Sequence, residues 1–381
     1  MRYHVAVIGA GPAGSTAARH LAQSGLSVLL LEKALMPRVK PCGGALTHRA
    51  LTLLPSGAES FLQEHPHSWT FQSRTAPAVT IARDQPYCHI VERQHFDRFL
   101  AQAARHAGAE VHEGEALTSL RIQDDRVHLV TTSGHYQADW VVAADGAPSL
   151  TAKLAGFPRP RQGAAIETEV AVSAHEFARY QGRVEIHLGQ YPWGYAWVIP
   201  RAGILNLGVG SFRPNSFALK QEFYAFVEHI VGHRPIQALG HALPYRISFQ
   251  PPVRDRILFV GDAAGYMDAF SAEGIYSALR SGLLAAQSIV EQKCQPTASA
   301  AYARRFHAEF WPSLKAAIKM SLLFYPLVGF WSDFFARNQT LLADYLDVAS
   351  GHIPYQVLQR HTERALLAQP RLLLHQHLSD L

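Results

Sequence analysis

The chain has only three cysteines among its 381 residues, Cys42, Cys88 and Cys294. Their number is odd and their spacing matches no metal pattern, so we expect neither a disulfide framework nor a zinc site. The 21 histidines are scattered as well, and we predict no metal. This cysteine usage favours a reduced, cytoplasmic setting.

Long apolar runs and blocks of like charge are missing too. No run reaches the roughly 18 apolar residues typical of a spanning helix, and no signal-peptide pattern precedes the first strand. Lys and Arg are dispersed despite a net charge of +5, so we expect no nucleic-acid partner. The most apolar late segment, 321–335, is interrupted by Pro326, Gly329 and Asp333. We expect a buried helix pair there, with peripheral contact to a membrane as the alternative.

A glycine-rich turn stands near the start of the chain. Residues 5–33 predict a strand, a helix and a second strand. Gly9 permits the tight turn, Gly11 lets the backbone approach a pyrophosphate, and Gly14 allows the helix to pack closely on the strand. Glu32 ends the second strand, where a carboxylate accepts hydrogen bonds from an unphosphorylated ribose. These features predict a dinucleotide site at the helix N-terminus.

Two later signatures each follow a buried strand. One is VVAADGAPS at 141–149, with Asp145 at the turn. The other is ILFVGDAAGYMDAFSAEGIYSALRSG at 257–282, with Asp262 at the turn. A simple turn or helix cap explains either signature taken alone. Their order behind the glycine-rich turn favours a single nucleotide-binding domain that is discontinuous in sequence.

The periodicity of the remaining chain predicts an α/β protein with a strand-rich middle and a helical C-terminal part. We expect strands at 110–112, 116–122, 127–132, 135–138, 139–144, 164–172, 183–188, 194–200, 204–211 and 257–260. We expect helices at 12–24, 94–107, 216–231, 273–292, 298–320, 333–349 and 354–368.

Four segments complete the pattern: PRVKPCGG at 37–44, RQHFDRFL at 93–100, YAWVIP at 195–200 and GDAAG continuing to SAEGI at 261–275. With the motifs above, they resemble the geranylgeranyl reductase family, within the para-hydroxybenzoate-hydroxylase-like FAD-dependent oxidoreductases. The likeness covers most of residues 1–320. The chain departs from the family's pattern at Ile199, Arg201, Asp268–Ala269 and Ser271–Ala272. These departures bear on the substrate and leave the expectation of FAD unchanged.

The resemblance implies a Rossmann-like FAD-binding domain of the glutathione-reductase type with an inserted β-sheet substrate domain and C-terminal helices. The expected FAD-binding domain comprises 1–75, 94–158 and 251–295. The expected substrate domain comprises 76–93 and 159–250, and the helical region comprises 296–381.

The resemblance also implies roles for individual residues. Asp262 is expected to hold the ribityl chain, and Gly274 and Ile275 to face the flavin with their backbone. Arg38 and Lys40 are expected to contact phosphate or NAD(P)H, or to form a solvated loop. The expected cofactor-binding residues are Gly9, Gly11, Pro12, Ala13, Gly14, Glu32, Lys33, Arg38, Cys42, Gly43, Gly44, Arg93, Asp145, Gly261, Asp262, Gly274 and Ile275. Tyr195, Trp197 and Cys42 are the expected catalytic residues beside the substrate.

The implied activity is reduction of C=C bonds in a hydrophobic, isoprenoid-like substrate by hydride transfer from reduced FAD, with NAD(P)H as the expected electron donor. The alternative is a monooxygenase that hydroxylates an aromatic or other apolar substrate through a flavin hydroperoxide. A halogenase is a further alternative because YAWVIP is similar to the W-x-W-x-I-P run of those enzymes. A prenyl-chain binder similar to the GDP-dissociation inhibitors is disfavoured because Glu32 and Asp262 are both present.

Overall fold

The computed structural model describes residues 1–123 and 125–369. One half of the molecule is built on a mostly parallel sheet in the order β17-β18-β11-β1-β2-β8, with β10 paired to β11 and β9 paired to β10. The predicted α/β fold is confirmed. The strands of this sheet are β1 (Arg2–Ile8), β2 (Val28–Glu32), β8 (Glu110–Glu113), β9 (Leu117–Gln123), β10 (Arg126–Thr131), β11 (His135–Ala143), β17 (Val253–Arg254) and β18 (Ile257–Phe259).

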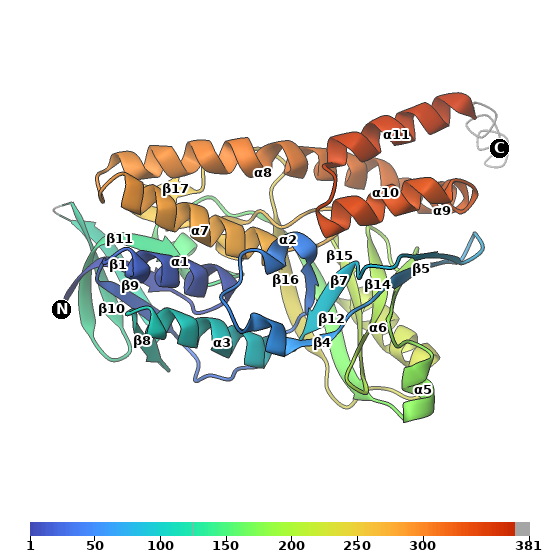
Figure 1. The fold of residues 1–381 in the computed structure, drawn as a ribbon, viewed down its shortest axis with the longest axis horizontal. Coiled ribbons are helices and arrows are strands. Elements are labelled where there is room, and N and C mark those ends of the chain that lie inside the picture. Colours follow the sequence, from blue (N-terminus) through green and yellow to red (C-terminus); the bar gives the residue numbers. More distant parts are fainter. Residues whose placement is uncertain (124, 370–381) are drawn as a thin grey trace.

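Helices cover this sheet because its central strands are apolar on both faces. The cores of β1 and β2 are fully buried, and α1 (Pro12–Gln23) follows β1 directly. Helix α7 (Ile275–Glu291) packs against α1, and α3 (Arg93–His106) lies on the other side of α1 (Figure 1). The two helices α1 and α7 approach closely at Gly282, where an added Cβ would lie 2.2 Å from the carbonyl oxygen of Ala13.

The second half is a seven-stranded sheet in the order β16-β12-β15-β14-β13-β5-β6. All neighbouring strands in it are antiparallel except β13 and β5. Helix α6 (Ser216–Val231) packs on β15 and β12. The strands are β5 (Ser68–Ser73), β6 (Val79–Ala82), β12 (Arg161–Ala171), β13 (Arg183–Leu188), β14 (Gly194–Arg201), β15 (Ile204–Ser211) and β16 (Leu239–Tyr245).

Short elements join the two halves. A three-stranded sheet, in the order β3-β7-β4, lies between them (Figure 1). The strands of this small sheet are β3 (Ala45–Thr47), β4 (Leu62–Glu64) and β7 (Cys88–Val91), with α2 (His48–Leu51) and η1 (Ala58–Phe61) between β3 and β4 in the chain. The other short elements are α4 (Leu150–Leu154) after β11, η2 (Gly261–Ala264) after β18, and α5 (Ala174–Ala178) between β12 and β13 of the second sheet.

The C-terminal helices form a roof over both halves. Helix α8 (Thr297–Phe324) runs along α7 and reaches across to the second sheet, where α9, α10 and α11 follow it (Figure 1). Aromatic and aliphatic side chains of α8 to α11 share one core with the inner face of the second sheet. The later elements are η3 (Tyr325–Leu327), α9 (Val328–Arg337), α10 (Gln339–Ser350) and α11 (Tyr355–Ala368). Residues 370–381 of the predicted helical region 296–381 lie outside the described residues.

Three predictions about elements were wrong. The expected strands 135–138 and 139–144 form one strand, β11. Its more polar first residues, 135–138, pair with β10, so the change in polarity along the sequence does not mark the end of a strand. The expected helix 333–349 is two helices, broken at Asn338 with φ −125° and ψ 62°. Residues 68–73, placed in the FAD-binding segment 1–75, form β5 in the second sheet. The domain boundaries as a whole stay a prediction.

One stretch, Thr297–Arg337, is long and apolar enough to cross a membrane by length and composition, with a hydropathy of 1.2. Of its most apolar window, 39% is buried inside the protein. The core helices of proteins outside membranes pass the same test, so this is weak evidence for a span. The expectation of no spanning helix therefore stays a prediction.

Candidate functional site

A single large cavity of about 630 Å³ connects the two halves of the molecule. One end is formed by the glycine-rich turn after β1, and the other by apolar side chains of the second sheet and of α8, α10 and α11. Every predicted site residue except Gly14 lines this cavity. The structure therefore brings together the predicted cofactor-binding residues and the predicted catalytic residues Tyr195, Trp197 and Cys42.

The glycine-rich turn has the shape that the sequence predicts. Gly9 has a φ of +101°, and an added Cβ would lie 2.4 Å from the carbonyl oxygen of Ala144. At Gly14 an added Cβ would lie 1.9 Å from the Gly9 carbonyl oxygen, so Gly14 serves packing. Gly11 faces open space, and no side chain caps the N-terminus of α1. Open backbone at an uncapped helix N-terminus fits the pyrophosphate of FAD.

Glu32 and Arg93 lie in a chain of alternating charges behind this turn. Arg38 lies 3.4 Å from Glu32 and 3.3 Å from Asp97, which in turn accepts two hydrogen bonds from Arg93. The two carboxylate oxygens of Glu32 accept hydrogen bonds from the backbone N–H groups of Ala10 and Ala34. Arg93 and Asp97 are both buried, and each neutralises the other. Arg93 therefore contributes its position in the cavity wall, while its charge is already paired. Lys33 is exposed at the rim.

Asp262 also lines the cavity and has two basic partners. Its Oδ2 atom is 3.5 Å from Nε2 of His241, and the Lys40 ammonium lies 3.0 Å from that same ring nitrogen. Burial alone would raise the pKa of Asp262, but His241, Lys40 and Arg93 together lower it. Burial also lowers the pKa of Lys40, with Asp262 acting in the other direction. An ionised carboxylate facing the cavity suits the hydroxyl groups of a ribityl chain.

The loop that contains Cys42, Gly43 and Gly44 crosses the middle of the cavity wall. Its Cys42 N–H donates to Oε1 of Glu167 at 2.6 Å, and its Gly44 N–H donates to the Cys42 sulfur at 3.4 Å. Gly44 has a φ of +72°, and an added Cβ would lie 2.1 Å from the Val91 carbonyl oxygen. The loop is thus fixed to both halves of the molecule.

The inner face of the second sheet forms the floor of the cavity. The Trp197 ring lies over Gly208, where an added Cβ would meet it at 2.1 Å, and its Nε1 donates to Asn206 at 2.7 Å. Tyr195 lies opposite Gly210 in the sheet register and donates its hydroxyl proton to the Ser271 carbonyl oxygen. Both aromatic residues therefore line the cavity with their polar atoms already bonded to protein.

The Asp145 side chain forms hydrogen bonds within its own loop. Its carboxylate accepts hydrogen bonds from the Ser149 hydroxyl and from the N–H and hydroxyl of Thr151. It thus holds the start of α4, while its backbone lines the cavity. A direct role of the Asp145 side chain toward the pyrophosphate stays a prediction.

Helix α7 begins beside the cavity, as the motif at 261–275 predicts. Gly261 has a φ of +55°, Gly274 is the N-cap residue, and the Glu273 side chain accepts a hydrogen bond from the Tyr276 N–H. Gly274 and Ile275 both line the cavity, so the positive dipole end of α7 lies beside it and suits the charge that a flavin ring gains on reduction.

The departures Asp268 and Ala272 shape the loop before α7. Asp268 accepts hydrogen bonds from the N–H groups of Phe270 and Ser271, and from the Tyr355 hydroxyl at 2.7 Å. Helix α11 is thereby tied to the loop. Ala272 has a φ of +57° where the family pattern has glycine, so this loop stores backbone strain of about 1 kcal/mol.

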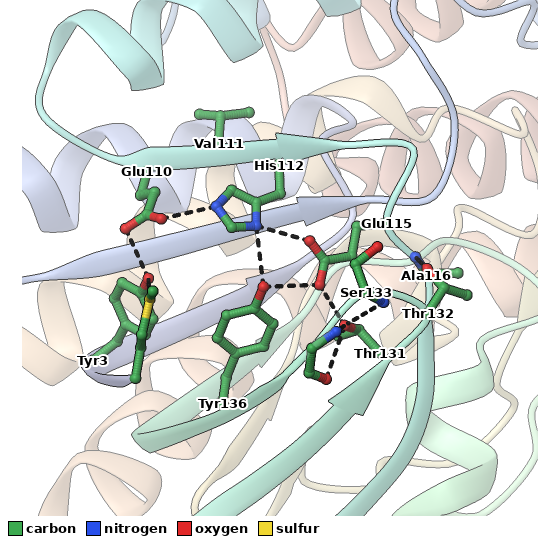
Figure 2. A network of polar contacts seen from close by, with 12 residues as sticks. Tyr3, Glu110, Val111, His112, Glu115, Ala116, Thr131, Thr132, Ser133 and Tyr136 are labelled. Carbon is green, nitrogen blue, oxygen red and sulfur yellow. Dashed lines mark hydrogen bonds and ion pairs between the residues drawn. The ribbon is translucent and has the colours of Figure 1, made fainter.

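A network of polar side chains lies behind the cavity end near Glu32 (Figure 2). His112 contacts Glu110 and Glu115 at 2.8 Å each, and Tyr3 and Tyr136 donate to the same two carboxylates. Glu115 lines the cavity, so the network fixes that part of the wall. Burial alone would lower the pKa of His112, but the two carboxylates raise it above its ordinary value.

We expect the His112→Gln variant to lose stability mainly at mildly acidic pH. A raised folded-state pKa stabilises the protein below the unfolded value of about 6.5, and this stabilisation is lost as the pH rises through the folded value. Because His112 is partly exposed, we expect a difference of about 1 kcal/mol or less. Urea unfolding at several pH values measures it. An equal stability difference at acidic and alkaline pH would contradict this assignment.

Comparison with known proteins decides the family. Residues 2–200 match the family model described as FAD binding domain. This chain belongs to that family. The match spans the glycine-rich turn, Glu32, the Cys42 loop and Asp145, which agrees with the cavity wall described above. The protein is an FAD-dependent oxidoreductase, with FAD as its cofactor.

Curated relatives of this FAD-binding protein include two reductases. Geranylgeranyl diphosphate reductase from Oryza sativa subsp. japonica is 29% identical over 352 residues, which cover 85% of this chain and 75% of the relative. Digeranylgeranylglycerophospholipid reductase from Methanosarcina mazei is 29% identical over 310 residues, which cover 76% and 75%.

Solved structures show a similar fold. A geranylgeranyl bacteriochlorophyll reductase-like protein from Thermoplasma acidophilum has a TM-score of 0.78 at 22% identity, over 97% of this chain and 99% of that chain. A flavin-dependent brominase has a TM-score of 0.74 at 20% identity, over 96% and 99%. At these identities the likeness concerns the fold alone.

Sequence reasoning missed three residues of the cavity region: Asp97, Glu167 and His241. Asp97 had a detectable signal, because it follows Arg93 by four residues on a predicted helix, the spacing of an ion pair. Glu167 and His241 had none, since they lie on β12 and β16 outside every motif. Their proximity to Cys42 and Asp262 depends on the tertiary fold.

Proposed function

We propose that this protein reduces carbon–carbon double bonds of a hydrophobic, isoprenoid-like substrate, using reduced FAD. The observation that carries the proposal is the single cavity that joins the FAD-binding turn to an apolar chamber. That chamber is roofed by the C-terminal helices and lined by side chains such as Phe270, Phe324, Phe335 and Leu358. An alkene chain in it lies within one enclosure with the flavin.

The chemistry of the chamber supports a long apolar chain. Each buried CH₂ group contributes about 0.8 kcal/mol, so a five-carbon isoprene unit gains roughly 3–4 kcal/mol on entering. Three buried polar atoms in the wall have no hydrogen-bond partner within the part of the chain that the structure describes, namely Thr47 Oγ1, Trp69 Nε1 and Tyr87 OH. They favour a substrate that carries a polar group at one end. Two curated relatives are named for geranylgeranyl and digeranylgeranyl compounds, which fit this description.

FAD, when bound and reduced, supplies a hydride to the alkene. The residues of this chain bind and orient the partners and exclude water. Asp262 and the N-termini of α1 and α7 hold the cofactor, while Tyr195 and Trp197 form the floor under the substrate. The closed roof of α8 to α11 keeps solvent from the reacting carbons.

The electron donor and the surroundings complete the proposal. NAD(P)H is the proposed reductant, and the test is whether NADH or NADPH bleaches the bound flavin.

We also propose a cytoplasmic protein with peripheral membrane contact. Leu322, Leu323 and Leu327 are exposed on the outer side of the turn whose inner side chains Phe324 and Tyr325 line the cavity. Apolar contact at this point would bring a lipid substrate next to the chamber.

An anaerobic single-turnover experiment tests the proposed reaction. The FAD-loaded protein is reduced, mixed with geranylgeranyl diphosphate without oxygen, and followed by flavin absorbance and product mass. We expect the flavin to be reoxidised and the product to gain two hydrogen atoms for each bond reduced. Should the alkene leave the flavin reduced, while oxygen yields an oxygenated product, the protein is a monooxygenase instead.

A further inference from the structure

Reduction of a double bond requires a proton as well as a hydride, and its source is the open point of the proposed function. The inference below rests on that function. The cavity wall of the described residues holds several carboxylic acids, and most are committed elsewhere. Glu32 accepts from two backbone N–H groups near the ribose end, and Asp145 holds the start of α4. Glu115 belongs to the His112 network, and Asp262 is paired with His241.

Glu273 is committed as well. It accepts a hydrogen bond from the Tyr276 N–H and forms an ion pair with Arg49, away from the sheet that forms the floor. The phenols in the wall are poor acids, because burial raises the pKa of Tyr195 and Tyr345 above the ordinary value. The Tyr195 proton is also bonded to the Ser271 carbonyl oxygen.

Glu167 differs from all of these acids. It lies on β12 in the floor of the cavity and is only 6% exposed. In the sheet register it is opposite Gly208, the residue covered by the Trp197 ring. Its Oε1 accepts the hydrogen bond from the Cys42 N–H, which leaves Oε2 to carry a proton. Among the described residues, no Lys, Arg or His side chain forms an ion pair with Glu167.

We propose that Glu167 is the proton donor, delivering its carboxyl proton to the substrate carbon that does not receive the hydride. The step balances as follows. The π bond and the acid O–H bond break, the hydride leaves reduced FAD, and two C–H bonds form. The alkene is reduced, FAD is oxidised, and the Glu167 carboxylate regains a proton from water before the next turnover.

The charges around Glu167 suit this role. Burial raises its pKa to about 7, although the Cys42 N–H and the Asn206 side-chain amide act in the opposite direction. Glu169 on the same strand raises the pKa further, and Arg93 lowers it. The other charged groups at this part of the wall, Lys40, His241 and Asp262, pair mainly with one another. At neutral pH a large share of Glu167 is therefore protonated and ready to act as an acid.

The test compares Glu167→Gln, Glu167→Asp and Glu169→Gln in the FAD-loaded protein. Glutamine keeps an oxygen for the Cys42 N–H but has no acidic proton, whereas aspartate keeps the acid. Glu169 lies two residues along the strand, outside the cavity wall, and glutamine there retains an acceptor for Arg201. Two anaerobic rates are measured for each: flavin reoxidation by geranylgeranyl diphosphate, which needs a proton, and by ferricyanide, which takes electrons alone.

We expect Glu167→Gln to lose at least about 100-fold in the alkene rate, the size of a general-acid contribution, with an unchanged ferricyanide rate. Glu169→Gln should keep the ferricyanide rate and lose only a small part of the alkene rate, because loss of the Glu169 charge lowers the pKa of Glu167. The wild-type alkene rate should fall as the pH rises through about 7, and Glu167→Asp should shift that fall. A normal alkene rate in Glu167→Gln overturns the proposal. A second result also overturns it: Glu167→Gln loses the alkene rate and the ferricyanide rate equally, and Glu167→Asp leaves the pH profile of the alkene rate unshifted. That result would mean that Glu167 only positions the Cys42 loop. If the wild type reduces no alkene, the proposed function itself fails.

Discussion

Replacing Gly14 by alanine is expected to leave little folded protein. The new methyl group would lie 1.9 Å from the carbonyl oxygen of Gly9, and neither backbone segment has room to move. Overpacking against backbone in the core costs about 1–3 kcal/mol and occasionally more, and the very short contact here places Gly14→Ala at about 3 kcal/mol or above. That is a large part of the total stability of a typical domain. Denaturant unfolding of the purified variant, or its yield of soluble protein, measures the effect.

Gly11→Ala is the matched control within the same turn. An added Cβ at Gly11 has open space, with the Arg38 guanidinium as its nearest neighbour at 3.6 Å. We expect this variant to fold normally and to lose affinity for FAD, because the methyl group faces the position of the pyrophosphate. Flavin content and an FAD titration measure this. Equal stability of the two variants would contradict the assignment of Gly14 to packing and of Gly11 to FAD binding.

Filling the floor of the cavity at Gly210 is expected to weaken the binding of long substrates about 100-fold while FAD stays bound. A Cβ at Gly210 makes only ordinary contacts, 3.5–3.7 Å from Trp197, Ala165 and Leu243. The larger side chain of Gly210→Leu must extend into the chamber. If it displaces one isoprene unit, roughly 3 kcal/mol of burial is lost, which raises KM about 100-fold. Steady-state kinetics with geranylgeranyl diphosphate measure this change.

Gly210→Ala serves as the control at the same position, since its methyl group fits without reaching the chamber. Its KM should stay close to the wild-type value. Loss of FAD from Gly210→Leu would place the flavin, and not the substrate, over this part of the sheet. An unchanged KM in both variants would show that the substrate chain lies elsewhere.

The sequence was most informative where one residue type is required locally. The turn at Gly9, the uncapped start of α1 and the helix Ser216–Val231 follow from steric and periodic rules that act over a few residues. Strands β5 and β6 were not predicted, because their short segments have weak alternation and gain stability by pairing with β13 and with each other.

The candidate site could be predicted only in part, for a similar reason. Its phosphate-binding end consists of contiguous motifs, and a contiguous motif is visible in a sequence. Its substrate end is assembled from single residues on separate strands, such as Glu167 and His241. Asp145 is the opposite case, because its motif was visible in the sequence but the hydrogen-bond partners of its side chain were not. Its carboxylate accepts from Ser149 and Thr151, and these contacts depend on the conformation of the local loop.

The path of the chain through the first sheet has a consequence for biosynthesis. The sheet needs β18, and α1 needs α7 as its packing partner, yet both arrive more than 230 residues after β1 and α1. Since domains generally fold as units while the ribosome extends the chain, the N-terminal half must wait for this late segment. No nascent chain that ends before α7 has a complete cofactor site. Capture of FAD is therefore among the last events of synthesis, after the substrate-binding sheet has already emerged.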